Sequence, residues 1–234
     1  MTQSKKNYFY MIAPASNKFF GAEPLTYCSD QEASVGGIVE IELNNNKCYG
    51  IILSSSDKPD FPTKPIVKVT DYNLGSKKLN FIKNLVAYYP NPIGHVASLF
   101  LPKKYYESRD ADTNTKKPSD IKLSDQQIEA VKRIDESGSK TIVLHGITGS
   151  GKTRIYIKLA LKEFLAGKSS LILVPEISLT PKIIKDFVEI FGEDSVVAFH
   201  SGLTQSQRDK IWASVFRSNK IIIGARSALF LPIK

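Results

Sequence analysis

Gly146-Ile147-Thr148-Gly149-Ser150-Gly151-Lys152-Thr153 is the stretch that decides the fold, because it fits the phosphate-binding pattern G-x-x-x-x-G-K-[ST] at every fixed position. The glycines of this pattern let consecutive backbone N–H groups face the phosphates of a nucleotide, and the helix that follows presents its positive end to the same anion. Lys152 is expected to reach the β and γ phosphates, and the Thr153 hydroxyl to bind the accompanying Mg²⁺. All eight residues are therefore candidate nucleotide-binding residues, with Lys152 and Thr153 as the candidate catalytic pair.

The segments around this stretch give it the strand, loop and helix that the motif requires. Residues 141–145 form an apolar run that predicts a buried strand, and residues 152–166 are rich in helix formers. Strands and helices then alternate, with strands predicted at 170–174, 195–199 and 220–224 and helices at 124–136, 181–191 and 204–218. Such alternation predicts an α/β fold with a parallel sheet, whose nucleotide lies at the carboxyl ends of the strands.

The first half of the chain has a different pattern. Residues 38–43 and 48–53 alternate in polarity around a turn, which predicts an antiparallel hairpin, and residues 66–69 predict a further short strand. Apolar residues at helical spacing predict helices at 79–89 and 95–101. Residues 107–120 contain a single aliphatic residue, Ala111. We therefore expect a small β-rich domain at 1–106, a flexible linker at 107–120 and an α/β domain at 121–234.

Charge and cysteine content limit the class of protein. The formal net charge is +9 over 234 residues, and the excess is spread along the chain, with 15 Lys+Arg against 12 Asp+Glu up to residue 120 and 17 against 11 after it. This distribution favours a nucleic-acid partner. Cys28 and Cys48 lack the spacing of a zinc site or a disulfide framework, and no apolar run is long enough to span a membrane. The sequence predicts a cytoplasmic chain with no zinc site and no membrane partner.

Four polar loops near predicted strands are candidate ligand loops: 123–127, 174–180, 199–204 and 224–230. Gln127 could place its amide near an adenine edge, and Arg226 suits a phosphate because its guanidinium forms a planar fork. Two alternatives stay open from the residues alone. The loop at 174–180 could be an ordinary proline-containing loop before a capped helix, and Arg226 could form a structural ion pair.

These motifs together resemble the primosomal replication-restart DNA helicases, the PriA family of superfamily 2. The resemblance rests on residues 145–153, on 173–181, on 200–203 with Arg208 and Trp212, and on 223–230; residues 88–94 resemble the end of that family's DNA-binding domain. It implies a 3′-end-binding type of DNA-binding domain at 1–106 and a partial RecA-like helicase lobe at 121–234. The implied function is an ATP-dependent 3′→5′ DNA helicase for replication restart.

The resemblance also implies cofactors, partners and site residues. ATP and Mg²⁺ would be the cofactors, with Gln127 near the adenine. The partners would be stalled forks and single strands of DNA, together with primosome and single-strand-binding proteins. The implied DNA-binding residues are Tyr27, Gly36, Lys64, Ser178, Thr180, Arg226 and Ser227.

The sequence departs from the family pattern at several points. Thr26 stands where the family usually has an acidic residue, and Glu42-Leu43-Asn44 replaces its Pro-Phe-Gly. No winged-helix domain separates the two predicted domains, and the acidic DEEH motif, the zinc-binding cysteines and the second lobe are expected beyond Lys234. The chain alone is therefore expected to lack ATPase activity. The alternative function is a non-catalytic DNA-binding adaptor that retains an incomplete phosphate-binding loop, and an unrelated P-loop kinase or transporter ATPase fits the other motifs less well.

Overall fold

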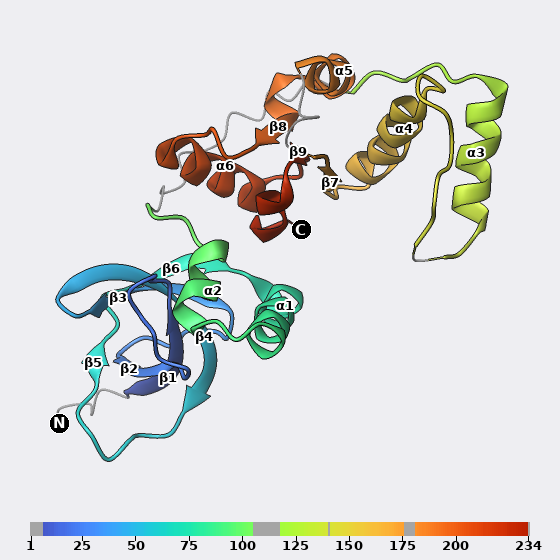
Figure 1. Cartoon of the computed structure of the whole chain (residues 1–234). Coiled ribbons are helices and arrows are strands. Elements are labelled where there is room, and N and C mark those ends of the chain that lie inside the picture. Colours follow the sequence, from blue (N-terminus) through green and yellow to red (C-terminus); the bar gives the residue numbers. More distant parts are fainter. Residues whose placement is uncertain (1–6, 105–117, 140, 176–180, 234) are drawn as a thin grey trace. The chain divides into compact units, whose positions relative to one another are not determined.

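The computed structural model describes residues 7–104, 118–139, 141–175 and 181–233. The chain divides into two compact units, Met1–Tyr105 and Tyr106–Lys234 (Figure 1). Most of the predicted linker, 107–117, lies outside the described residues, but its last residues, 118–120, pack against the rest of the second unit. The Ser119 amide donates to the Ile190 carbonyl at 3.0 Å, and Asp120 pairs with Lys158 at 2.9 Å. None of the described helices is long and apolar enough to cross a membrane.

The first unit is built on a six-stranded sheet whose order is β5-β2-β1-β4-β3-β6. Neighbouring strands in this sheet run antiparallel, except that β2 and β5 are parallel. The strands are β1 (Tyr8–Pro14), β2 (Leu25–Ser29), β3 (Gly37–Leu43), β4 (Asn46–Ser56), β5 (Lys64–Pro65) and β6 (Lys68–Asn73).

This sheet is rolled so that its two ends meet. The amide of Ile66 donates to the Cys28 carbonyl on β2 at 2.8 Å, and the amide of Val67 donates to the Glu40 carbonyl on β3 at 2.9 Å. The short segment between β5 and β6 therefore hydrogen-bonds to β2, near one edge of the sheet, and to β3, near the other edge. Closure of this kind covers backbone groups that an open edge would expose.

The predicted hairpin is confirmed as β3 and β4. Asn44 and Asn45 connect the strands with φ of 49° and 62°, the left-handed backbone that a two-residue type I′ turn requires and that asparagine tolerates. The period-two alternation turns Val39 and Ile41 into the core, where both are fully buried, while Glu40 and Glu42 face outward.

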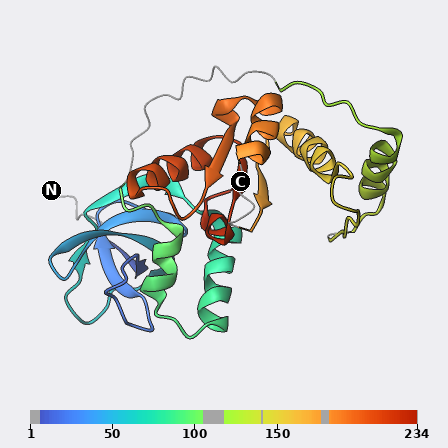
Figure 2. The ribbon, with the colours of Figure 1, turned by 45° about the horizontal axis from the view of Figure 1, so that its top comes forward.

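Two helices cover one side of the rolled sheet. Helix α1 (Gly75–Tyr88) begins four residues before the predicted start, because Gly75 adopts a φ of 72° and its amide bonds the Asn73 side chain at 2.8 Å. Helix α2 (Ile93–Phe100) buries Val96 and Phe100. In both ribbon views α2 lies between the sheet and α1 (Figures 1 and 2).

The second unit contains a parallel sheet of three strands in the order β7-β9-β8, which confirms the predicted α/β alternation. The strands are β7 (Ser170–Leu173), β8 (Val196–Phe199) and β9 (Ile221–Gly224). The helices are α3 (Asp125–Glu136), α4 (Lys152–Leu165), α5 (Pro181–Phe191) and α6 (Gln205–Arg217), with short 3-10 turns η2 (Glu193–Ser195) and η3 (Arg226–Phe230). The core packs α4 and α5 against β9 around Phe187 and Phe191.

Capping explains where two of these helices begin. Ser124 accepts the Gln127 amide at the start of α3, and Thr204 accepts the Gln207 amide at the start of α6. In each case the glutamine side chain bonds back to the backbone of the capping residue, which forms a capping box. The predicted boundaries of both helices are therefore correct to within a residue.

The strand predicted at 141–145 is wrong. These residues lie outside both sheets, and Val143 is 89% exposed. A strand needs a hydrogen-bonded neighbour, and this segment pairs with none of the described strands. The segment runs beside α3 on the side of α4 away from the sheet (Figure 2). Apolar composition therefore predicted burial that the fold does not provide.

Candidate functional site

The glycine stretch forms a loop that folds around the ammonium group of Lys152. Gly149 and Gly151 have φ of 83° and 80°, and Gly151 is the N-cap residue directly before α4. Lys152 Nζ donates to the carbonyls of Gly146 at 2.6 Å and Ile147 at 2.9 Å. The first turn of α4 has no side-chain cap, and the Arg154 amide donates to the Gly151 carbonyl at 3.0 Å. The amides of Lys152 and Thr153 are therefore the ones that can donate to an anion.

Gln127 is brought to this loop by α3. Its side-chain oxygen accepts the Ser124 amide at 3.0 Å as part of the capping box, and its Nε2 donates to the Gly151 carbonyl at 3.4 Å. A side chain at position 151 would collide with this amide. The predicted adenine contact therefore lies beside the predicted phosphate loop.

The remaining residues of the loop are mostly exposed. Ile147, Thr148, Gly149 and Ser150 are open to solvent, and Thr153 lies half-buried in the first turn of α4. The next residue, Arg154, ties α4 to the chain before α3, because its Nε donates to the Lys122 carbonyl at 3.1 Å. The loop is thus anchored through its helix, since the segment that precedes it is not part of the sheet.

A second candidate site lies at the carboxyl ends of the three parallel strands. The last residues of these strands are level, because Leu173 and Phe199 both pair with Gly224. The loops that follow therefore meet around an open hollow of about 720 Å³. The residues that line it are Leu173, Val174, Pro175, Ser201, Ala225, Arg226 and Ser227.

Arg226 and Arg208 have different roles around this hollow. Arg226 is exposed and makes no ion pair within the part of the chain that the structure describes, so the structural ion pair considered from sequence is not formed there. Arg208 is instead used internally. Its guanidinium donates to the carbonyls of Leu203 at 3.1 Å and Ser201 at 2.6 Å, which fixes the loop that carries Ser201.

The predicted DNA-binding residues of the first unit lie on or beside the rolled sheet. Tyr27 is 3% exposed and donates its hydroxyl to the Glu42 carbonyl at 3.0 Å. Burial raises the pKa of Tyr27 to about 12, with the nearby Cys48 and Glu42 adding to the rise, so the phenol stays protonated as a donor. Lys64 is exposed on β5 and pairs with the Glu42 carboxylate at 2.8 Å.

Gly36 has a structural reason for being glycine. Its φ is 87°, its amide donates to the Ile52 carbonyl at 2.8 Å, and a Cβ would meet Asn73 Oδ1 at 2.6 Å. Of the other predicted DNA-binding residues, Ser227 lines the hollow beside Arg226, whereas Ser178 and Thr180 lie outside the described residues.

The candidate ligand loops 174–180 and 199–204 each contribute a residue to the hollow, Pro175 and Ser201. Parallel strands that end together place the loops after them at one edge of the sheet. Sequence reasoning missed one residue of these sites, Glu42, which holds Lys64. Glu42 carried no signal beyond its departure from the family pattern, since its partner is more than twenty residues away along the chain.

Two family profiles match this chain, one in each of its two units. A family profile described as the 3′DNA-binding domain matches residues 19–102. A second profile, described as type III restriction enzyme, res subunit, matches residues 120–233. The two matched regions contain the rolled sheet and the parallel sheet respectively.

Curated relatives match nearly the whole chain. The replication restart protein PriA of Helicobacter pylori is 34% identical over 228 residues, which cover 97% of this chain and 35% of that protein. The protein of the same name from Bacillus subtilis is 37% identical over 236 residues, covering 96% of this chain and 27% of the relative. In Rickettsia conorii the identity is 33%, over 90% of this chain and 34% of the relative. The chain thus spans about a third of the length of these relatives.

Proposed function

Because the chain belongs to the PriA family of replication restart proteins, we propose that it binds DNA with both of its units and a nucleotide at the glycine loop. In this proposal it is the amino-terminal part of an ATP-dependent 3′→5′ DNA helicase. Its DNA substrates would be forks and single strands. The observation that carries the proposal is the exposed guanidinium of Arg226 at the strand-end hollow, which makes no ion pair with the described residues and lies in the same unit as the glycine loop.

The residues of the glycine loop fit ATP and Mg²⁺. Backbone N–H groups at the uncapped start of α4 would take the phosphates, Lys152 would exchange its two carbonyl partners for phosphate oxygens, and Thr153 would hold the metal ion. Gln127 would face the base. When bound, ATP supplies the free energy of phosphate hydrolysis that drives a helicase.

The strand-end hollow fits a DNA backbone. Arg226 offers a planar fork that matches a phosphate, and Ser201 and Ser227 add hydroxyl groups beside it. Contacts of this type position a strand without reading its sequence. Binding in the hollow is therefore expected to depend strongly on salt and weakly on base composition.

A non-catalytic DNA-binding adaptor is the second candidate, and one observation favours it. The segment before the glycine loop, 141–145, is not paired in the sheet and leaves Val143 exposed. A loop held only through α4 is less rigid than one held from both sides, so we expect weak nucleotide binding and no DNA-stimulated turnover from this chain by itself.

The test measures both ligands on the full chain. DNA binding is followed by the anisotropy of a labelled single strand at salt concentrations from about 50 mM to about 300 mM, and nucleotide binding by a fluorescent ATP analogue with Mg²⁺. Arg226→Ala should weaken DNA binding and reduce the magnitude of the salt slope by about one, leaving the nucleotide affinity unchanged.

Lys152→Ala serves as the reciprocal variant. It should abolish nucleotide binding and leave DNA binding unchanged, because the Lys152 side chain is turned into its own loop. DNA binding by the wild-type chain without detectable nucleotide binding would favour the adaptor. DNA-stimulated hydrolysis that Lys152→Ala removes would instead contradict the expectation of inactivity, and absence of DNA binding would contradict both candidates.

A further inference from the structure

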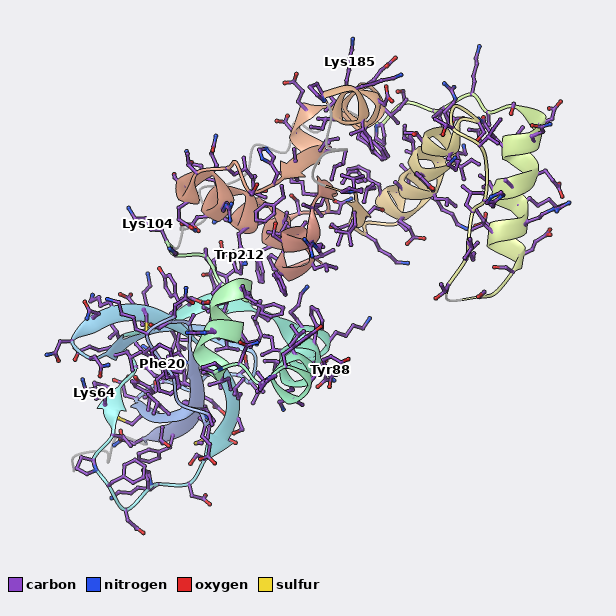
Figure 3. The ribbon with its side chains drawn as sticks, in the orientation of Figure 1. Phe20, Lys64, Tyr88, Lys104, Lys185 and Trp212 are labelled. Carbon is purple, nitrogen blue, oxygen red and sulfur yellow. The ribbon has the colours of Figure 1, made fainter. Side chains whose placement is uncertain are left out.

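The ion pair between Glu42 and Lys64 lies on the surface of the first unit. Lys64 Nζ is 2.8 Å from Glu42 Oε1, and the two side chains are 52% and 46% exposed. Figure 3 marks Lys64 on the short strand β5. The pair is thus accessible to solvent and to any ligand that approaches this side of the sheet.

The rolled sheet brings these two residues together. Glu42 is near the end of β3 and Lys64 begins β5, and these strands stand four places apart in the sheet order. Tyr27 fixes both of them. Its hydroxyl bonds the Glu42 carbonyl at 3.0 Å, and its backbone is in register with Lys64 across the parallel pair of β2 and β5. The backbone therefore holds the carboxylate and the ammonium group within reach of each other.

The choice of partners around Glu42 is selective. Lys47 lies directly across from Glu42 in the β3 and β4 ladder, yet Lys47 pairs with Glu40 at a distance of 3.5 Å. Glu42 pairs with Lys64 instead, at the shorter distance. The hairpin therefore carries two glutamates on one face. Glu40 pairs with a lysine of the same hairpin, Lys47, and Glu42 pairs with Lys64 on β5.

We propose that Glu42 competes with DNA for Lys64, so that a phosphate has to displace the carboxylate before Lys64 can contact it. The inference rests on the proposed function, in which the first unit binds DNA, with Lys64 among the DNA-binding residues that the family resemblance implies. Carboxylate and phosphate oxygens accept hydrogen bonds from the same ammonium protons. The ion pair is exposed, so it contributes little stability and is easily opened.

Once displaced, the Glu42 carboxylate stays close to the bound phosphate, because its backbone is held by Tyr27. Two negative charges about 4 to 6 Å apart in water repel with an energy of the order of RT. Glu42 thus lowers the affinity twice, first by occupying Lys64 and then by repelling the ligand. The expected result is a domain that releases DNA more readily than its lysine content predicts.

The experiment replaces the carboxylate by its uncharged isostere in the full chain. Binding is measured with an oligothymidylate of about 15 nucleotides, labelled at its 5′ end so that its 3′ end is free. Glu42→Gln should bind about five times more tightly than the wild type at about 50 mM salt, which corresponds to the loss of one nearby repulsive charge. The gain should fall below about twofold at about 500 mM salt, because salt screens the charge.

Two further variants separate this effect from a general change of charge. Glu40→Gln makes the same substitution two residues away on the same strand, where the partner is Lys47. It should change the affinity by less than about twofold, because its charge is paired away from Lys64. In a Lys64→Met background, Glu42→Gln should give no gain, since methionine keeps the length of the side chain but not its charge.

The outcomes are distinct. Tighter binding by Glu42→Gln that disappears in the Lys64→Met background supports the inference. An equal gain from Glu40→Gln, an equal gain without Lys64, or no gain from Glu42→Gln would each overturn it while DNA binding itself remains. A wild-type chain that does not bind the oligonucleotide at any salt concentration would overturn the proposed function as well.

Discussion

Replacing Gly151 by alanine tests how the phosphate loop is built. Gly151 and Gly149 have almost the same φ, 80° and 83°, so alanine at either position carries the cost of a left-handed backbone, about 1 to 2 kcal/mol. Their surroundings differ. A Cβ at 149 meets no atom within 4 Å, whereas a Cβ at 151 collides with the amide of Gln127.

Gly151→Ala is therefore expected to cost more than Gly149→Ala. The Gln127 amide has to leave the Gly151 carbonyl, and losing one such hydrogen bond costs about 1 kcal/mol. The free energy of unfolding is measured in urea by tryptophan fluorescence, because the single tryptophan, Trp212, is buried in the second unit. Nucleotide affinity, measured on the same variants, should fall most for Gly151→Ala, since it loses both the loop backbone and the position of Gln127.

A double-mutant cycle isolates the contact with Gln127. Truncating Gln127 to alanine should reduce the extra cost of Gly151→Ala to nearly zero, because nothing then occupies the space of the new methyl group. This comparison also removes any difference that arises because Gly151 is the N-cap residue of α4 and Gly149 is not. If the extra cost stays the same without the Gln127 side chain, or if both glycine variants cost the same from the start, Gln127 does not contact the loop as described.

Two further predictions concern the cores of the two units. Burial raises the pKa of Tyr27 from its ordinary value near 10 to about 12. As the pH rises, the phenol therefore ionises in the unfolded chain before it ionises in the folded one. The free energy of unfolding of the first unit should be unaffected below about pH 10 and fall between about pH 10 and 12. Circular dichroism melts across this range should show a smaller fall for Tyr27→Phe, and an unchanged fall would contradict the assignment. Phe187→Ala should destabilise the second unit by about 3 to 5 kcal/mol in the Trp212 fluorescence assay, because Phe187 is fully buried against Phe191. Phe100→Ala, an equal truncation in the first unit, should leave that transition unchanged, and a shift of similar size would show that the units unfold together.

The helicase-like unit could be predicted from sequence wherever a local rule decides the structure. Ser124 and Thr204 mark helix starts because each capping box is complete within four residues. The glycine loop could be predicted because its backbone requires residues without a side chain. The strand at 141–145 failed for the opposite reason. Whether an apolar segment becomes a strand depends on pairing with a neighbour elsewhere in the chain, and residues 141–145 pair with none of the described strands.

The ion pair of Glu42 and Lys64 shows the same limit at a candidate site. Alternating polarity predicted that Glu40 and Glu42 face outward, and both do. It could not predict that they pair differently, because the geometry that separates them comes from the closure of the sheet through Ile66 and Val67. The alternation of polar and apolar residues therefore predicts which face of the strand carries a charge, but the closure of the sheet decides which opposite charge it pairs with. Under the proposed competition for Lys64, the DNA affinity of this unit is expected to be set by residues such as Glu42 as much as by lysines.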